Sequence, residues 1–150
     1  VYKRQLLLGG SFTSVDGETR GGLARIQIDR YDDGSLDPFF SVWANGTVRA
    51  IRLQQESSYS LPTGLIVGGD FTALNGLPRN HIARLSLTLA EIPDDPYEEG
   101  FVAHVDGSFA AGGGVDGTVF ALGALPDETH FAAGNFANVS GSPRTSIAHL

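Results

Sequence analysis

Residues 67–85 read VGGDFTALNGLPRNHIARL, and the same pattern occurs twice more in the chain. Residues 8–26 repeat it closely, and residues 132–150 repeat it more loosely. In each copy a phenylalanine follows a glycine pair, which is Ala-Gly in the third copy. After the phenylalanine come a turn glycine, an arginine and an Ala-x-aliphatic sequence. Recurrence at long, similar intervals is the signature of a repeat architecture, so the repeat governs the fold.

The copies agree position by position. The phenylalanines Phe12, Phe71 and Phe136 lie 59 and 65 residues apart. Each is followed by an apolar residue, a turn former and a glycine at the third, fourth and fifth positions, and by an arginine at the eighth. The third copy departs from the pattern where Ala133 replaces the first glycine and His149 replaces a later arginine. The arginines of the eighth position are Arg20, Arg79 and Arg144.

A less regular half-unit lies between the copies. Asp33-Gly34-Ser35-Leu36 aligns with residues 106–109, and the Gly-Thr-Val of residues 46–48 aligns with that of residues 117–119. Insertions near residues 55–62 and 91–100 account for the unequal spacing. The second insertion is acidic and contains prolines, so we expect a solvated surface loop there.

The predicted secondary structure is almost entirely strand. Four short runs are rich in β-branched and apolar residues and are bounded by Gly, Asp, Asn or Pro. They are residues 48–53, 64–69, 81–87 and 118–125. A unit of about 60 residues with three or four strands matches one blade of a β-propeller, because so small a sheet must stack on its neighbours.

The predicted fold class is therefore all-β: a β-propeller-like repeat of about 60 residues with roughly two and a half blades, open at both ends. We expect a single repeat domain over residues 1–150. It divides into a partial blade over 1–45, a blade over 46–116 and a partial blade over 117–150.

Three sets of repeated residues are predicted to organise the blades. The glycines before each phenylalanine have no side chain, so a neighbouring backbone or ring can pack against the strand. The phenylalanines are expected in the core between blades. The arginines are expected to tie tight turns to carbonyls or a carboxylate of the next blade, and the alternative is a ligand surface with one arginine per repeat. The second glycines of the pairs are Gly10, Gly69 and Gly134.

These motifs carry a family resemblance. The diglycine, phenylalanine, turn glycine and Ile-Ala-Arg-Leu succession, followed by Asp-Gly-Ser and Gly-Thr-Val-Arg-Ala-Ile, resembles the delta-60 repeat family of β-propeller-like proteins. It is more distantly similar to kelch repeats. The resemblance implies a β-propeller architecture, chiefly in secreted or surface-exposed bacterial proteins. It implies no reaction and therefore no catalytic residues.

Composition excludes several classes of function. The chain has 150 residues, 10 basic and 17 acidic side chains, and a formal net charge of −7. An acidic surface repels phosphate, so we predict no nucleic-acid partner. The apolar runs are far shorter than the ~20 residues of a membrane-spanning helix, so no membrane span is expected. Without cysteine there is no disulfide, thiol nucleophile or thiolate metal site.

No catalytic or cofactor site is predicted. The four histidines lack metal-ligand spacing and no nucleophile elbow occurs, so we predict that the chain is not an enzyme. Calcium is the one candidate cofactor, since four aspartates cluster around Gly34. An Asp-Gly turn explains the same residues and is the favoured interpretation. The weak calcium candidates are Asp29, Asp32, Asp33 and Asp37.

Two sequons are present. Asn45-Gly46-Thr47 and Asn138-Val139-Ser140 both fall where turns are expected, so Asn45 and Asn138 are candidate glycosylation sites if the chain is secreted.

The sequence thus predicts a non-catalytic extracellular or cell-surface structural module. Because the chain begins inside one blade and ends inside another, we expect self-assembly or adhesion through blade edges and incomplete terminal repeats. A head-to-tail contact gives a ring if it closes and a filament if it does not, with a second copy, another surface protein or a glycan as partner. The alternative is a ligand-binding fragment of a larger surface β-propeller, for glycan or protein. Its site would lie on residues 41–46 and 112–117, with Trp43 either core or ligand contact.

Overall fold

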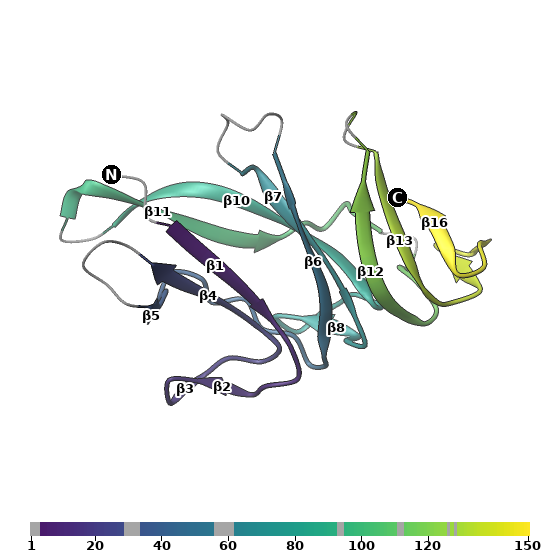
Figure 1. Cartoon of the computed structure of the whole chain (residues 1–150), viewed down its shortest axis with the longest axis horizontal. Helices are drawn as coiled ribbons and strands as arrows, with labels where there is room; N and C mark the ends of the chain where they lie inside the picture. Colours follow the sequence, from purple (N-terminus) through teal and green to yellow (C-terminus); the bar gives the residue numbers. More distant parts are fainter. Residues whose placement is uncertain are drawn as a thin grey trace.

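The computed structural model describes residues 4–28, 34–55, 62–92, 95–110, 113–125, 127 and 129–150. In these ranges the chain is all-β, with strands and turns and no helix. Three antiparallel sheets follow one another from the N-terminal to the C-terminal part of the chain (Figure 1). None of them closes on itself, so the predicted all-β fold of partial propeller blades is confirmed.

The central sheet, here the second blade, has four strands. In spatial order they are β11 (Asp95–Val105), β10 (Ile82–Ile92), β7 (Gly64–Gly69) and β6 (Val48–Gln54). Each pairs antiparallel with its neighbour, as expected for a meander of consecutive strands. The predicted strands at 48–53 and 64–69 match β6 and β7, and the strand predicted at 81–87 continues to residue 92.

The flanking blades are each one strand short in the described part of the chain. The first blade consists of β1 (Arg4–Gly9), β4 (Leu23–Ile28) and β5 (Ser35–Leu36). The third consists of β12 (Thr118–Ala124), β13 (His130–Asn135) and β16 (Ile147–His149). By the repeat, β1 corresponds to β7 and β12 to β6. The first blade therefore has no described counterpart of β6, and the third has none of β11.

A small hairpin recurs in every copy of the motif. The three hairpins are β2 (Ser14–Val15) with β3 (Glu18–Thr19), β8 (Ala73–Leu74) with β9 (Leu77–Pro78), and β14 (Asn138–Val139) with β15 (Ser142–Pro143). In the second, the turn residues Asn75 and Gly76 have φ of 47° and 76°, and the other two turns have nearly the same angles. Two successive positive φ values define a type I′ turn, which explains the turn former followed by glycine in each copy.

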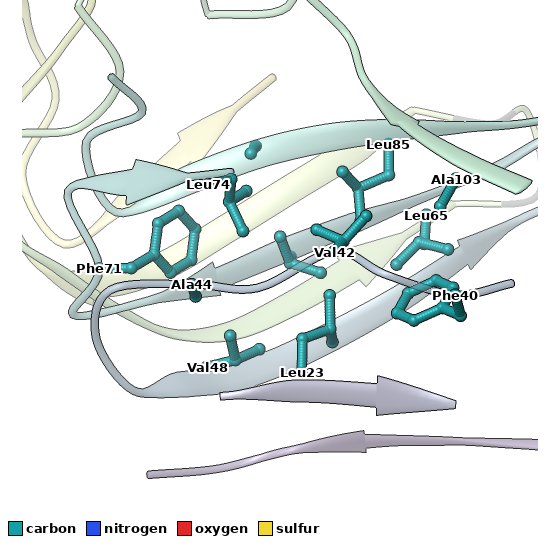
Figure 2. Packing of buried hydrophobic residues seen from close by; sticks show 12 residues of the cluster. Leu23, Phe40, Val42, Ala44, Val48, Leu65, Phe71, Leu74, Leu85 and Ala103 are labelled. Atoms are coloured by element: carbon teal, nitrogen blue, oxygen red, sulfur yellow. The ribbon is translucent and has the colours of Figure 1, made fainter. Parts of the chain in front are cut away.

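The core consists of two layers, one on each side of the second blade. Leu65 lies in the first cluster, and Ile66, the next residue of β7, lies in the second. Because successive side chains of a strand point to opposite faces, a blade with a neighbour on both sides buries both faces. All six residues of β7 are accordingly buried. Figure 2 shows the first layer, where Leu65 and Leu85 lie on the side of Leu23 and Phe40.

The acidic insertion was predicted wrongly. Residues 91–100 were expected to form a solvated loop, but most of them belong to the long hairpin of β10 and β11, in which Glu91 pairs with Glu99. Pro96 of β11 lies at the register shift between Glu91 and Ile92, where no pairing with β10 is formed, so its missing N–H costs no ladder hydrogen bond. The acidic segment therefore belongs to a strand pair and not to a loop.

Candidate functional site

Two repeats contain the same arginine–aspartate–phenylalanine cluster. Arg25 Nε donates to Asp37 Oδ2 at 2.8 Å, and the guanidinium lies 4.9 Å from the centroid of the Phe40 ring. In the second blade Arg84 Nε donates to Asp106 Oδ2 at 2.7 Å, with the Phe109 ring at 5.1 Å. Each aspartate N–H also donates to the carbonyl of its arginine, at 2.8 and 2.9 Å. Asp37 and Asp106 are therefore the equivalent residues.

This equivalence corrects the sequence alignment, which matched Asp33 with Asp106. The Asp-Gly dipeptide at residues 33–34 suggested that alignment. The ion pairs instead match Asp37, the partner of Arg25, with Asp106, the partner of Arg84. Asp29, Asp32 and Asp33 lie outside the described residues. Asp37 is buried, and its other carboxylate oxygen accepts the Phe39 N–H at 2.9 Å. Its oxygens are thus engaged by the chain itself, and no group of three metal-ligating side chains occurs in the described part of the chain.

The two clusters differ in burial. The Arg25 side chain is 2% exposed and the Arg84 side chain 36%. Burial lowers the pKa of the Arg25 guanidinium, and the charge of Asp37 opposes that shift. Arg25 also donates to the carbonyl of Phe101 in β11, so the first cluster connects the first blade to the second.

The repeated arginines lie on the small hairpins. Arg20, Arg79 and Arg144 each donate to the carbonyl of the preceding residue, at 2.8, 2.6 and 2.8 Å. Arg79 also reaches the Asp106 carbonyl at 3.1 Å. These bonds remain within one blade, whereas the sequence predicted contacts with the next blade. The turn is short enough for the guanidinium to fold back on its own hairpin.

The repeated phenylalanines face the preceding blade. Phe71 is fully buried in the first core cluster, and Phe136 is 5% exposed in the second. Phe12 is only half-buried, because no described blade precedes its own.

In the second and third blades, the second glycine of the pair lies against the backbone at the start of β6 or β12. A Cβ at Gly69 would lie 2.0 Å from the Thr47 carbonyl oxygen, and a Cβ at Gly134 would lie 2.0 Å from that of Thr118. At Gly10 the nearest atom to such a Cβ is a ring carbon of Phe12, at 3.0 Å. The Phe12 ring thus lies at the place where β6 and β12 lie in the other two blades.

In the first two copies, the first glycine of the pair packs against a valine of the following blade. A Cβ at Gly68 would lie 2.5 Å from Val119 Cγ1, and one at Gly9 would lie 3.1 Å from Val48 Cγ1. The third copy has Ala133 at this position, and no described blade follows it.

Asn45 and Asp116 perform the same task in successive blades. Asn45 Oδ1 accepts the N–H groups of Thr72 and Ala73, both at 2.9 Å. Asp116 Oδ1 accepts those of Ala137 and Asn138, also at 2.9 Å. Asn45 Nδ2 further donates to Thr72 Oγ1, and Asn138 Nδ2 donates to Asp116 Oδ2. Both sequon asparagines therefore hold a small hairpin in place.

We expect Asn45→Ala to lower the free energy of unfolding by about 1 kcal/mol, because two backbone N–H groups exchange their acceptor for water. Asn45→Asp should cost much less, since Asp116 shows that a carboxylate serves the same position. Urea denaturation of both variants measures the difference. Equal losses for Ala and Asp would contradict the assigned role.

In the loops predicted for ligand binding, the described residues 41–46 and 113–117 are hydrogen-bonded to neighbouring segments of the chain. Val42 and Ala44 are buried, and Ala44 N donates to the Gly21 carbonyl at 2.7 Å. In the next repeat Val115 N donates to the Asn80 carbonyl at 3.0 Å. Trp43 is 45% exposed, so the interpretation of this residue as core is wrong.

A polar contact joins the second and third blades. Arg49 Nη2 lies 2.6 Å from Asp70 Oδ2, and Thr118 Oγ1 donates to Asp70 Oδ1 at 2.8 Å. The hydrogen bond from Arg49 and then that from Thr118 lower the pKa of Asp70.

Stability is expected to fall at acid pH. Hydrogen bonds from Ser108 and from Arg84 hold the pKa of Asp106 well below its usual range. A carboxylate with a lowered folded-state pKa stabilises the fold above its unfolded pKa of ~3.9 and loses that contribution as the pH falls toward the folded value. We therefore expect the melting temperature to drop between about pH 4 and pH 2. Asp106→Asn should melt lower at neutral pH and lose less on acidification; an unchanged slope would contradict this.

The open side of β1 is the most distinctive surface of the described chain. Leu6 is 47% exposed, whereas its counterpart Leu65 in β7 is fully buried. β1 pairs with β4 on one side, and no described strand pairs with the other. An unpaired strand edge is a template for pairing with another polypeptide. We take this edge, from Gln5 to Gly10, as the candidate functional site and call it the β1 edge.

Comparisons with known proteins agree with the repeat. A family model described as a domain of unknown function (DUF5122) β-propeller matches residues 4–29 and 62–87. These segments contain β1 to β4 of the first blade, and β7, β8, β9 and the first six residues of β10 of the second. No curated protein and no solved structure matches the chain. In the described residues no helix is long and apolar enough to cross a membrane. The two matched segments are therefore similar to DUF5122 repeats, the delta-60 type, and the chain is a β-propeller-like repeat protein.

Proposed function

We propose that this chain is a non-catalytic structural module of the extracellular space or cell surface, which assembles with itself or with a surface partner through open blade edges. The observation that carries the proposal is the β1 edge. The equivalent strand β7 pairs with β6 on that side, and Leu65, the counterpart of Leu6, is fully buried in the core cluster between the first and second blades. An exposed, apolar strand edge favours association with another chain.

The placement of the repeated polar residues supports a structural role. The Arg25–Asp37 and Arg84–Asp106 pairs, together with Asn45 and Asp116, are engaged in bonds within and between blades. A ligand site needs convergent polar groups left for the ligand. The location outside the cell rests on the resemblance to delta-60 repeats of secreted and surface proteins.

The mass of the chain under native conditions tests the proposal. Light scattering coupled to size exclusion should show species larger than the 15.8 kDa monomer, with a distribution that shifts upward with concentration. Electron microscopy of the large fraction would distinguish closed rings from filaments. A monomer at every concentration, which also binds no surface partner, would overturn the proposal.

A ligand-binding blade is the second candidate, favoured by one observation. Trp43 presents its indole to solvent near the β8–β9 hairpin, with Trp43 N donating to Asn75 Oδ1 at 2.9 Å. A half-exposed aromatic ring offers an apolar face with a polar edge to a glycan or a peptide. Because Trp43 is the single tryptophan, its fluorescence reports binding directly. Titration with soluble oligosaccharides would shift the emission under this candidate and leave it constant under the first.

A further inference from the structure

We propose that Asn75 is a site of spontaneous covalent modification in the folded chain, where deamidation produces aspartate or isoaspartate. The chain contains two Asn-Gly sequences, Asn75-Gly76 and Asn45-Gly46, and the fold leaves the first reactive while it protects the second. The inference does not depend on the proposed function.

Deamidation of an Asn-Gly sequence needs only water as a co-reactant. The backbone nitrogen of the glycine loses its proton to solvent base and attacks the side-chain Cγ of the asparagine. The Cγ–Nδ2 bond then breaks, and ammonia leaves a five-membered succinimide ring. Water opens this ring at Cγ to give aspartate, or at the main-chain carbonyl carbon to give isoaspartate. Glycine favours the attack because it has no Cβ to crowd the nitrogen.

Asn75 and Gly76 form the exposed tip of the β8–β9 hairpin. Residues 75–78 are all exposed, and a Cβ at Gly76 would have no atom within 4 Å. The attack requires the turn to rearrange, because the Gly76 nitrogen must rotate toward Asn75 Cγ. Only two residue pairs join β8 to β9, so this hairpin can open locally without disturbing the core.

Asn45 and Gly46 are held from several sides. Asn45 Oδ1 accepts the N–H groups of Thr72 and Ala73, and Asn45 Nδ2 donates to Thr72 Oγ1, all at 2.9 Å. A Cβ at Gly46 would lie 2.9 Å from Phe71 Cα, and the Gly46 carbonyl oxygen would lie 2.7 Å from a Cβ at Gly22. Gly46 is thus packed between two segments of backbone. Its nitrogen cannot rotate toward Asn45 Cγ unless the contact between the first two blades opens.

The aspartate product fits the turn. The first hairpin already has Asp16-Gly17 at the equivalent position, with φ of 51° and 82°, close to the 47° and 76° of Asn75-Gly76. An aspartate at residue 75 also keeps an oxygen to accept the Trp43 N–H, which now donates to Asn75 Oδ1 at 2.9 Å. This product therefore adds a negative charge and leaves the fold in place.

The isoaspartate product does not fit the turn. Its main chain runs through Cβ, so a two-residue turn gains one backbone bond. The Asn75 N–H donates to the Trp43 carbonyl at 2.9 Å, and Asn75 Oδ1 accepts the Trp43 N–H. The added bond moves both groups relative to Trp43. We therefore expect isoaspartate to release the Trp43 segment from the hairpin.

Peptide mapping by mass spectrometry tests the proposal. The folded 150-residue chain is incubated in mildly alkaline buffer, and deamidation is read as a mass gain of about one dalton at each asparagine. We expect Asn75 to react at least about tenfold faster than Asn45, because opening the hairpin costs less than opening the blade contact. In concentrated urea the two sites should react at similar rates, since both are then followed by an unrestrained glycine.

Asn75→Ser is the matched control. Ser140-Gly141 occupies this turn in the third hairpin, with φ of 48° and 79°, so the fold should persist while the reactive amide is absent. Incubation should change the fluorescence of Trp43, the single tryptophan, in the unmodified sequence and leave it constant in Asn75→Ser. Equal rates at Asn45 and Asn75 in the folded chain, or reaction of Asn75 in urea alone, would overturn the proposal.

Discussion

Arg25→Ala is expected to lower the free energy of unfolding by about 3–5 kcal/mol, because it leaves the Asp37 carboxylate buried without its cation. Both side chains are at most 2% exposed and lie 2.8 Å apart. The substitution also removes the donor to the Phe101 carbonyl and the cation over the Phe40 ring. Since Phe101 belongs to the second blade, the contact between the first two blades should weaken as well. Urea denaturation measures the loss.

The matched control is Arg84→Ala in the equivalent cluster of the second blade. Arg84 pairs with Asp106 at 2.5 Å, but its side chain is 36% exposed, so water can solvate the remaining carboxylate. We expect a loss of about 1 kcal/mol or less. The double variant Arg25→Met with Asp37→Leu should recover most of the stability, because replacing both members of a buried pair is far less costly than removing one. Equal losses at Arg25 and Arg84 would show that burial is not the cause.

Gly69→Ala is expected to cost about 3 kcal/mol or more, since overpacking against a fixed atom forces the backbone to move. The new Cβ would lie 2.0 Å from the Thr47 carbonyl oxygen and 3.1 Å from Val48 Cα. Neither atom belongs to a flexible side chain. β6 must therefore shift away from β7, and the core between the first and second blades opens with it. The melting temperature and the urea midpoint both report this loss.

Two glycines serve as controls for this effect. Gly10→Ala occupies the same position of the motif, but its Cβ meets only the Phe12 ring, so we expect less than about 1 kcal/mol. Gly123→Ala lies in β12 with no atom within 4 Å of the added Cβ, and it should be neutral or slightly stabilising. A loss at Gly10 as large as that at Gly69 would mean that glycine is needed for a reason other than the crossing strand.

Much of the fold could be predicted from local sequence. The type I′ turns follow from Asp16-Gly17, Asn75-Gly76 and Ser140-Gly141, because these residues accept positive φ without help from distant contacts. The short β-branched runs predicted the strands, and the spacing of three phenylalanines predicted blades. These features depend on the conformational preferences of a few neighbouring residues and on the spacing of the repeated motif, and both can be read directly from the sequence.

The candidate site could be predicted only in outline. The incomplete terminal blades indicated open edges, but the sequence did not show which side of which strand is free. The glycine pair was recognised as a place of close approach, yet its two members have different neighbours. Gly68 faces Val119 of the next blade, and Gly69 faces Thr47 of its own blade. Those neighbours are far apart in sequence, so only the stacked blades reveal them.

The repeat, the strands and the turns of this protein thus follow from its sequence alone, because each depends on local conformational preference repeated at similar intervals. The choice of Asp37 over Asp33 as the partner of Arg25 and the pairing of the acidic segment in a hairpin do not. Each of these is set by contacts between distant segments. A carboxylate becomes a buried ion-pair partner, and a glycine a point of close contact, only when a distant segment of the chain packs against it.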